Sequence, residues 1–196
     1  MSVITNLSDL DLTKQYTFAD YLLWQFNDRV ELLKGFINKM SPAPNRKHQD
    51  LSRNLTVSLA QKFKSGTTCK VYFAPFDVRL PVPSAKKDTT VVQPDICIIC
   101  DKNKLDDHGC NGAPDLIVEI LSPNNSKYDA DIKFKLYEES GVKEYWMVQP
   151  EAQIVLVYTL INQQYSGLKP FTLGEIIDSP LFPDLKVTVD EIFEEL

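Results

Sequence analysis

The sequence predicts one domain that mixes α-helices and β-strands, an α/β or α+β fold. Residues 94–99 and 115–121 are short apolar runs, rich in β-branched and aliphatic side chains and bounded by Pro, Asp or Asn, as is typical of buried strands. Residues 45–64 carry Leu or Phe at every fourth position from Leu51 to Phe63, which predicts an amphipathic helix. With 196 residues, 43% of them hydrophobic, and no internal repeat, residues 1–196 are expected to fold as a single domain with a sizeable core.

The N-terminal region is predicted to hold a helix followed by a hairpin. Thr17 and Asp20 have the spacing of a capping box, which predicts a helix that continues to about residue 26. Residues 29–33 and 36–40 predict two strands that are joined by a tight Lys-Gly turn.

The C-terminal half is predicted to be rich in strands and to contain one more helix. This helix is expected to start at Ser126 or Asp129 and to end near Ser140, with Gly141 as its cap. A polar loop is expected over residues 101–113. The other predicted elements are strands at residues 69–74, 76–80, 144–149 and 153–160, then short strands from residue 163 and a helical turn near residues 190–196.

The charge distribution bears on possible partners. The net charge of −6 argues against constitutive, tight binding to nucleic acid driven by counterion release. Residues 46–64, however, carry five basic side chains against one acidic side chain, whereas residues 184–196 are acidic. Such a polarised surface can bind DNA on one side. A solvated helix face explains the same pattern without any ligand.

The sequence lacks the motifs that mark several classes of protein. There is no run of about 18 apolar residues to span a membrane, and the N-terminus lacks the basic start and apolar centre of a secretion signal, so a cytoplasmic protein without membrane association is expected. Glycine-rich phosphate loops and the G-x-S-x-G motif of serine hydrolases are absent.

The four cysteines offer a weak zinc signal. Cys97 and Cys100 form one C-x-x-C pair, to which His108 and Cys110 could add ligands. Positions three apart in a strand point to opposite faces, however, and no second C-x-x-C follows. Reduced thiols are therefore expected instead of zinc.

Each of the two apolar runs contains an acidic residue that a buried strand would not normally tolerate. Asp95 directly follows Pro94 at the start of the first run, and Glu119 lies in the middle of the second. A buried carboxylate is costly unless it is paired or binds a metal ion. On neighbouring strands with matching registers, two carboxylates would supply the oxygen ligands that Mg²⁺ prefers.

A lysine on the following helix could complete this site. Lys133 shares a helix face with Asp129 one turn before it and Tyr137 one turn after it. Packed across the second strand, this helix would aim Lys133 at the carboxylates, where a cation can orient water or meet developing phosphate charge. The alternative is an exposed Lys–Asp pair on an amphipathic helix.

The order of these motifs resembles the Uma-type restriction endonuclease family of the PD-(D/E)XK nuclease superfamily. The resemblance covers about residues 16–160, which leaves residues 161–196 as a C-terminal extension. It rests on the motifs Pro94-Asp95, Asp115-Leu116-Ile117-Val118-Glu119-Ile120-Leu121-Ser122-Pro123, Tyr128-Asp129 with Lys133 and Tyr137, and Gly141-Val142-Lys143-Glu144-Tyr145-Trp146, with Glu31 and His48 upstream.

The resemblance implies a restriction-endonuclease-like core, in which a mixed central sheet is flanked by helices. It further implies that Asp95 and Glu119 bind the metal with help from Glu31, and that Lys133 is the catalytic lysine. The superfamily places this lysine two positions after the glutamate, where the chain has Leu121. Lys133 would have to replace it from the helix.

The resulting hypothesis is a metal-dependent DNA endonuclease that uses Mg²⁺ or Mn²⁺. His48, and Arg46, Lys47 and Arg53 on the basic helix, are candidates for contacts with the DNA backbone. A homodimer is expected, because cutting both strands of a duplex needs two sites and two-fold dimers are common. One alternative is a catalytically inactive nuclease fold that acts as a binding or assembly module. Another is an unrelated small-molecule enzyme, which predicts a closed apolar pocket around Glu119.

Overall fold

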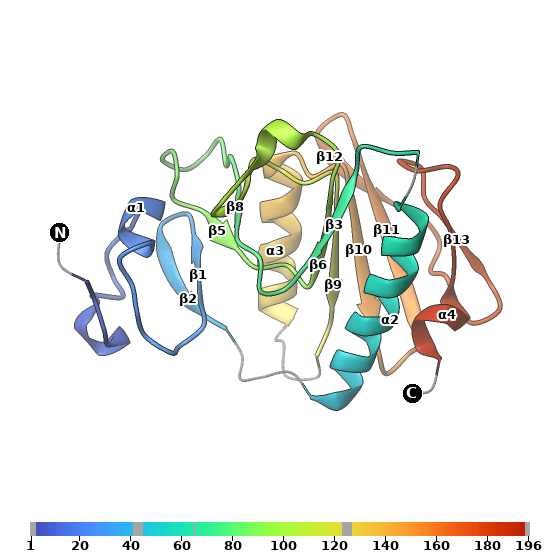
Figure 1. The fold of residues 1–196 in the computed structure, drawn as a ribbon, viewed down its shortest axis with the longest axis horizontal. Helices are drawn as coiled ribbons and strands as arrows, with labels where there is room; N and C mark the ends of the chain where they lie inside the picture. Colours follow the sequence, from blue (N-terminus) through green and yellow to red (C-terminus); the bar gives the residue numbers. More distant parts are fainter. Residues whose placement is uncertain (1–2, 41–44, 65, 123–126, 195–196) are drawn as a thin grey trace.

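The structure is a computed structural model that describes residues 3–40, 45–64, 66–122 and 127–194; for residues 127–129 it describes the backbone alone. It confirms the predicted mixture of helices and strands around a mixed central sheet (Figure 1). In this sheet β9 and β10 are parallel and the other neighbours are antiparallel. Its strands, in spatial order, are β12 (Gln164–Gly167), β11 (Ile154–Ile161), β10 (Glu144–Gln149), β9 (Leu116–Ile120), β6 (Ile96–Ile99) and β3 (Lys70–Phe73).

A second six-stranded sheet lies beside the central one. The predicted loop at residues 101–113 is wrong in part, because this segment contains a 3-10 turn, η2 (Lys102–Lys104), and a hairpin that joins the second sheet. These strands are very short and have the composition of a loop, so the sequence did not predict them. Their place in the sheet depends on the pairing of β8 with β4, which is distant in sequence. The strands are, in order, β2 (Phe36–Lys39), β1 (Val30–Leu33), β5 (Val91–Val92), β4 (Val78–Arg79), β8 (Gly109–Asn111) and β7 (Leu105–Asp106).

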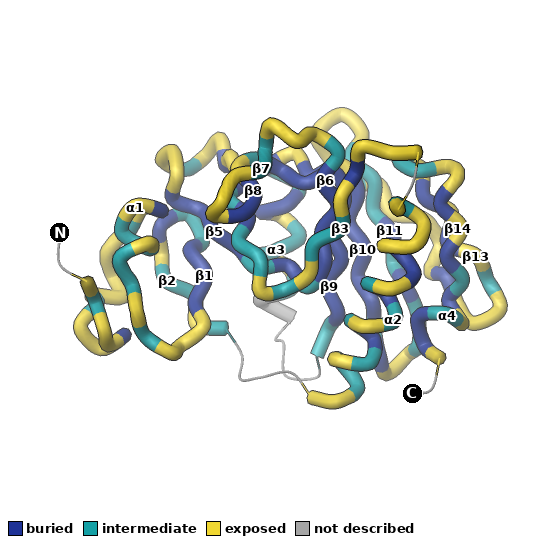
Figure 2. Tube along the Cα trace, in the orientation of Figure 1, coloured by how far each residue is buried: buried dark blue, intermediate teal, exposed yellow. Residues whose placement is uncertain are grey.

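Helices cover both faces of the central sheet. The helix α2 (Arg46–Lys62) packs its predicted leucine stripe on one face, together with α4 (Val189–Phe193). The helix α3 (Lys127–Ser140) and the second sheet cover the other face. Ser126, one of its predicted starting points, lies outside the described residues. Figure 2 shows β6, β9 and β10 as buried strands between these layers.

The N-terminal elements follow the prediction with one correction. Thr17 and Asp20 form the expected capping box, but α1 (Phe18–Tyr21) ends well before residue 26. Its hydrophobic side chains pack in a small cluster with β1 and β5. Residues 23–25 leave the helix and pair with Ile4 through backbone hydrogen bonds. A 3-10 turn, η1 (Leu7–Asp9), precedes it. The β1–β2 hairpin has the expected turn, with Lys34 and Gly35 both at positive φ.

The C-terminal residues pack against the central sheet. The hairpin of β13 (Ile176–Asp178) and β14 (Lys186–Thr188) joins the hydrophobic cluster of α2. Glu144 links β10 to this region, because its buried carboxylate accepts hydrogen bonds from Trp146 Nε1, Ser179 Oγ and the Leu181 backbone N–H. Burial raises the pKa of Glu144, and these donors oppose the shift.

The expectation of four reduced thiols is wrong for two of them. Cys69 and Cys100 form a disulfide. The antiparallel register of β3 and β6 pairs Lys70 with Ile99, so the two cysteines are the next pair along these strands. Cys97 and Cys110 are free and buried, and burial raises the pKa of both thiols, that of Cys110 to about 11.

Within the described residues, no helix is both long enough and apolar enough to cross a membrane.

Candidate active site

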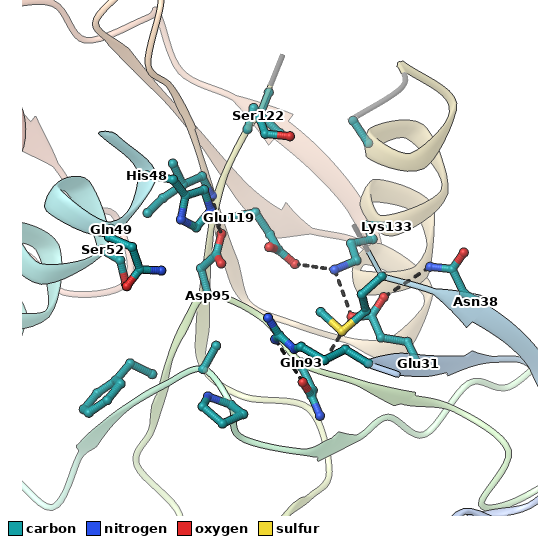
Figure 3. A pocket seen from close by; sticks show the side chains of 18 of the residues that line it. Glu31, Asn38, His48, Gln49, Ser52, Gln93, Asp95, Glu119, Ser122 and Lys133 are labelled. Carbon is teal, nitrogen blue, oxygen red and sulfur yellow. Dashed lines mark hydrogen bonds and ion pairs between the residues drawn. The ribbon is translucent and has the colours of Figure 1, made fainter. Parts of the chain in front are cut away.

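A cleft of about 460 Å³ opens at one end of the central sheet. The β9 strand ends here and β6 begins here, while α2 and α3 both start at this end, at the bottom of Figure 1. The elements around the cleft come from both sheets and from both helices. Its polar floor contains Glu31, Gln93, Asp95, Glu119 and Lys133, and His48 lies at its α2 side (Figure 3).

Asp95 and Glu119 face each other because of strand register. Ile96 pairs with Val118 in the antiparallel β6–β9 ladder, so the next pair along is Asp95 with Glu119. Side chains of directly opposed residues lie on the same face, with Cβ atoms about 5 Å apart. Asp95 Oδ2 accepts the Ile120 backbone N–H at 2.8 Å, which fixes this carboxylate against the end of β9.

Glu119 is a buried carboxylate that accepts hydrogen bonds from two side chains of α3. Lys133 Nζ and Tyr137 Oη donate to the same oxygen, Oε1, at 3.0 and 2.6 Å. Burial raises the pKa of Glu119 to about 7; Lys133 and Tyr137 oppose the shift, and the negative charges of Asp95 and Glu31 add to it. Tyr137 remains a donor, because burial and the carboxylates raise its own pKa well above the usual value.

Lys133 bridges two carboxylates. Its ammonium lies 3.0 Å from Glu119 Oε1 and 3.0 Å from Glu31 Oε1 (Figure 3). Burial alone would lower the pKa of Lys133, but the two carboxylates outweigh burial and raise it. Lys133 is therefore a fixed positive charge and does not accept a proton. Asp129 was expected one helical turn before Lys133, but its side chain is not among those that the structure describes.

Glu31 is held in place by protein donors at both oxygens. Oε1 accepts the Gln93 backbone N–H at 3.0 Å as well as Lys133, and Oε2 accepts Asn38 Nδ2 at 3.4 Å. Neither Gln93 nor Asn38 was expected at this site from the sequence. The two-residue turn of the hairpin sets the register that pairs Glu31 with Asn38, so this neighbour could have been found from the sequence. No comparable signal marks Gln93, since β5 and β1 are distant in the chain.

His48 lies beside Asp95, with Nε2 at 3.3 Å from Oδ2. Burial favours the neutral imidazole, but Asp95 and Glu119 outweigh it and raise the pKa of His48. Among the described residues, Nδ1 is buried without a hydrogen-bond partner.

The three basic residues predicted to contact substrate lie on α2 but not in the lining of the cleft. Arg46 pairs with Asp50 at 2.7 Å and Lys47 with Glu151 at 3.3 Å, while Arg53 donates to Asn54 Oδ1. The side chains of α2 that do line the cleft are His48, Gln49 and Ser52.

The chemistry of the donor set fits a hard divalent cation. No three His, Cys, Asp or Glu side chains of the described chain could hold a metal ion by themselves. Mg²⁺ needs no such cage, because proteins usually bind it through one or two carboxylates, with water and substrate phosphate as the other ligands. Asp95 Oδ1 and Glu119 Oε2 accept no hydrogen bond from the described residues, so both oxygens are left for a cation. Both oxygens of Glu31 are already engaged.

Comparisons with known proteins agree with this architecture. A solved structure described as a putative nuclease belonging to DUF820, from Anabaena variabilis, superposes with a TM-score of 0.70 at 19% identity, over 91% of this chain and 97% of that chain. At this identity the likeness shows the fold alone. No protein with a curated description matches the sequence. The family model Uma2, described as "Putative restriction endonuclease", matches residues 18–190. The chain therefore belongs to the Uma2 family.

Proposed function

We propose that this protein is a metal-dependent endonuclease that hydrolyses phosphodiester bonds in DNA. The observation that carries the proposal is the pair of opposed carboxylates, Asp95 and Glu119. Each has one oxygen that accepts no hydrogen bond from the described residues, and a fixed lysine charge lies beside them. Two like charges this close, of which Glu119 is buried and Asp95 partly buried, are costly unless a cation offsets them. Membership of a family described as restriction endonucleases supports the same reaction.

In this proposal Asp95 and Glu119 hold Mg²⁺ or Mn²⁺, which would supply Lewis-acid polarisation of the phosphate and a more acidic bound water. Lys133 orients the attacking water or stabilises negative charge that develops on the phosphate. Tyr137 keeps Glu119 in position through its short hydrogen bond. Glu31 aligns Lys133, because its Oε1 accepts both Lys133 and the Gln93 backbone N–H.

The contact with DNA is proposed to involve the end of α2. His48 has a raised pKa and lies within the cleft, where its protonated form would attract a phosphate. Arg46, Lys47 and Arg53 lie outside the cleft, and their role would be to hold the backbone on either side of the cut. The expected homodimer stays a prediction, which light scattering of the purified chain can test.

Nicking of supercoiled plasmid tests this function. With Mg²⁺ or Mn²⁺ the wild-type protein is expected to nick, and Asp95→Asn is expected to lose at least about 100-fold in rate, because it removes a ligand charge without changing shape. Lys133→Met is expected to lose activity as well, and it should be assayed where circular dichroism shows it folded. Asp107→Asn, an exposed acid outside the cleft, serves as the matched control.

The other possible results of the nicking assay lead to different conclusions. Equal nicking by wild type and Asp95→Asn would indicate a contaminating nuclease. Loss in Asp95→Asn alone would retain the metal site but remove Lys133 from the catalytic role. No nicking by any of them would favour the inactive binding module, for which the missing lysine at Leu121 and the acidic net charge are the motivating features.

A further inference from the structure

An exposed aromatic ring borders the cleft beside the carboxylates. Phe73, the last residue of β3, lines the cleft and is 58% exposed. It pairs with Ile96 in the β3–β6 ladder, and Ile96 directly follows Asp95. The backbones of Phe73 and Asp95 therefore lie close together. Alternation directs Asp95 towards the α3 face and Phe73 towards the α2 face, and both line the cleft at this end of the sheet.

Among the described residues, Phe73 belongs to none of the hydrophobic core clusters. Alternation along β3 puts Val71 against the α2 core and Tyr72 on the opposite face, where it stacks on Phe76 with ring centroids 4.3 Å apart. Phe73 returns to the α2 face, at the end of β3 that borders the cleft. Among the described residues it has no aromatic partner within stacking range, so its ring is open to a ligand.

The rest of the cleft has the chemistry to bind a nucleotide. Ala74 and Pro75 continue the apolar wall beside Phe73, whereas the hairpin side presents two cations, Arg29 and Lys39. Gln49 and Ser52 of α2 add hydrogen-bonding groups (Figure 3). An aromatic platform next to basic side chains is how proteins bind single strands, with bases stacked on the ring and phosphates on the cations.

The stacking requirement distinguishes unpaired from paired DNA. A base within a duplex is already stacked on its neighbours, so it can cover Phe73 only if it is flipped out or was never paired. The cleft also has the volume of a small-ligand site, which suits one or two nucleotides of a single strand.

We propose that the substrate of this cleft is an unpaired DNA strand, such as a single strand or a flap, with one base stacked on Phe73 and the adjacent phosphodiester at Asp95 and Glu119. The proposal rests on the proposed nuclease function. Cleavage of a single strand requires one active site, so one copy of the chain is enough for this substrate.

Two measurements on the same oligonucleotides test it. The first is binding of a labelled single strand, and of the same sequence as a blunt duplex, followed by fluorescence anisotropy in EDTA at low ionic strength. The second is their cleavage with Mn²⁺, with a flap-bearing duplex added. The variants are Phe73→Ala, Phe73→Trp, which keeps a stacking surface, and Phe36→Ala, an exposed phenylalanine of β2 that does not line the cleft.

The expected result is that single strand and flap bind and are cut at least about fivefold better than the duplex, and that Phe73→Ala loses at least this factor. Phe73→Trp and Phe36→Ala are expected to keep the preference. Equal use of duplex and single strand, or a neutral Phe73→Ala, would overturn the proposal even if the protein is a nuclease. Binding that depends on Phe73 without any cleavage would instead support the strand preference and reject the nuclease.

Discussion

Replacing Lys133 with methionine is expected to destabilise the metal-free protein by about 3–5 kcal/mol near pH 8. The ammonium is the cation that lies between Glu31 and Glu119, at 3.0 Å from each, and Glu31 is 1% exposed. Methionine has a similar length but leaves the two buried carboxylates with neutral donors alone and no cation between them. Near pH 6 the loss is expected to be smaller, because Glu119 then takes up a proton.

Urea denaturation at the two pH values measures this effect. Lys135→Met, an exposed lysine on the same helix, is the matched control and is expected to change stability by less than about 0.5 kcal/mol. Adding Glu119→Gln to Lys133→Met is expected to restore part of the stability, since one of the two opposing charges is removed. A loss below about 1 kcal/mol at both pH values would mean that the ion pairs contribute little, as exposed pairs do.

Glu119→Gln is expected to make the metal-free protein more stable near pH 8 while abolishing cleavage. The pKa of Glu119 is raised from an ordinary value of 4.5 to about 7 in the folded chain. Between these two values the folded state binds more protons than the unfolded state, so the free energy of unfolding falls as the pH rises through this window. The full cost of ionisation is about 3 kcal/mol above pH 7, and a neutral glutamine avoids it.

The pH dependence of unfolding provides the measurement. Wild type is expected to lose stability from about pH 5 to pH 7, and Glu119→Gln is expected to show a flatter profile over this range. Asp107→Asn should follow the wild-type profile. A profile for Glu119→Gln that is parallel to that of wild type would show that Glu119 does not titrate there, and would contradict the assigned burial effect.

Several local sequence patterns predicted the structure correctly. The leucine stripe from Leu51 predicted the buried face of α2, and Gly141 at positive φ ends α3 as expected. An acid inside each apolar run marked Asp95 and Glu119, and helical spacing placed Lys133 and Tyr137 on one face. These residues lie together because strand register and helix periodicity act over a few positions.

What the sequence could not predict depends on pairing between distant segments. The disulfide of Cys69 with Cys100 requires that β3 lies beside β6, and no local pattern specifies that neighbour. The support of Glu31 by Gln93 depends in the same way on β1 and β5 lying in one sheet.

Calorimetric titration of Mn²⁺ into the purified protein measures the step on which the proposed reaction depends, metal binding at Asp95 and Glu119. Wild type and Asp107→Asn are expected to bind Mn²⁺ alike, whereas Asp95→Asn and Glu119→Gln are each expected to lose this binding. Equal binding by wild type and Asp95→Asn, or no binding by wild type, would rule out a metal site at these carboxylates.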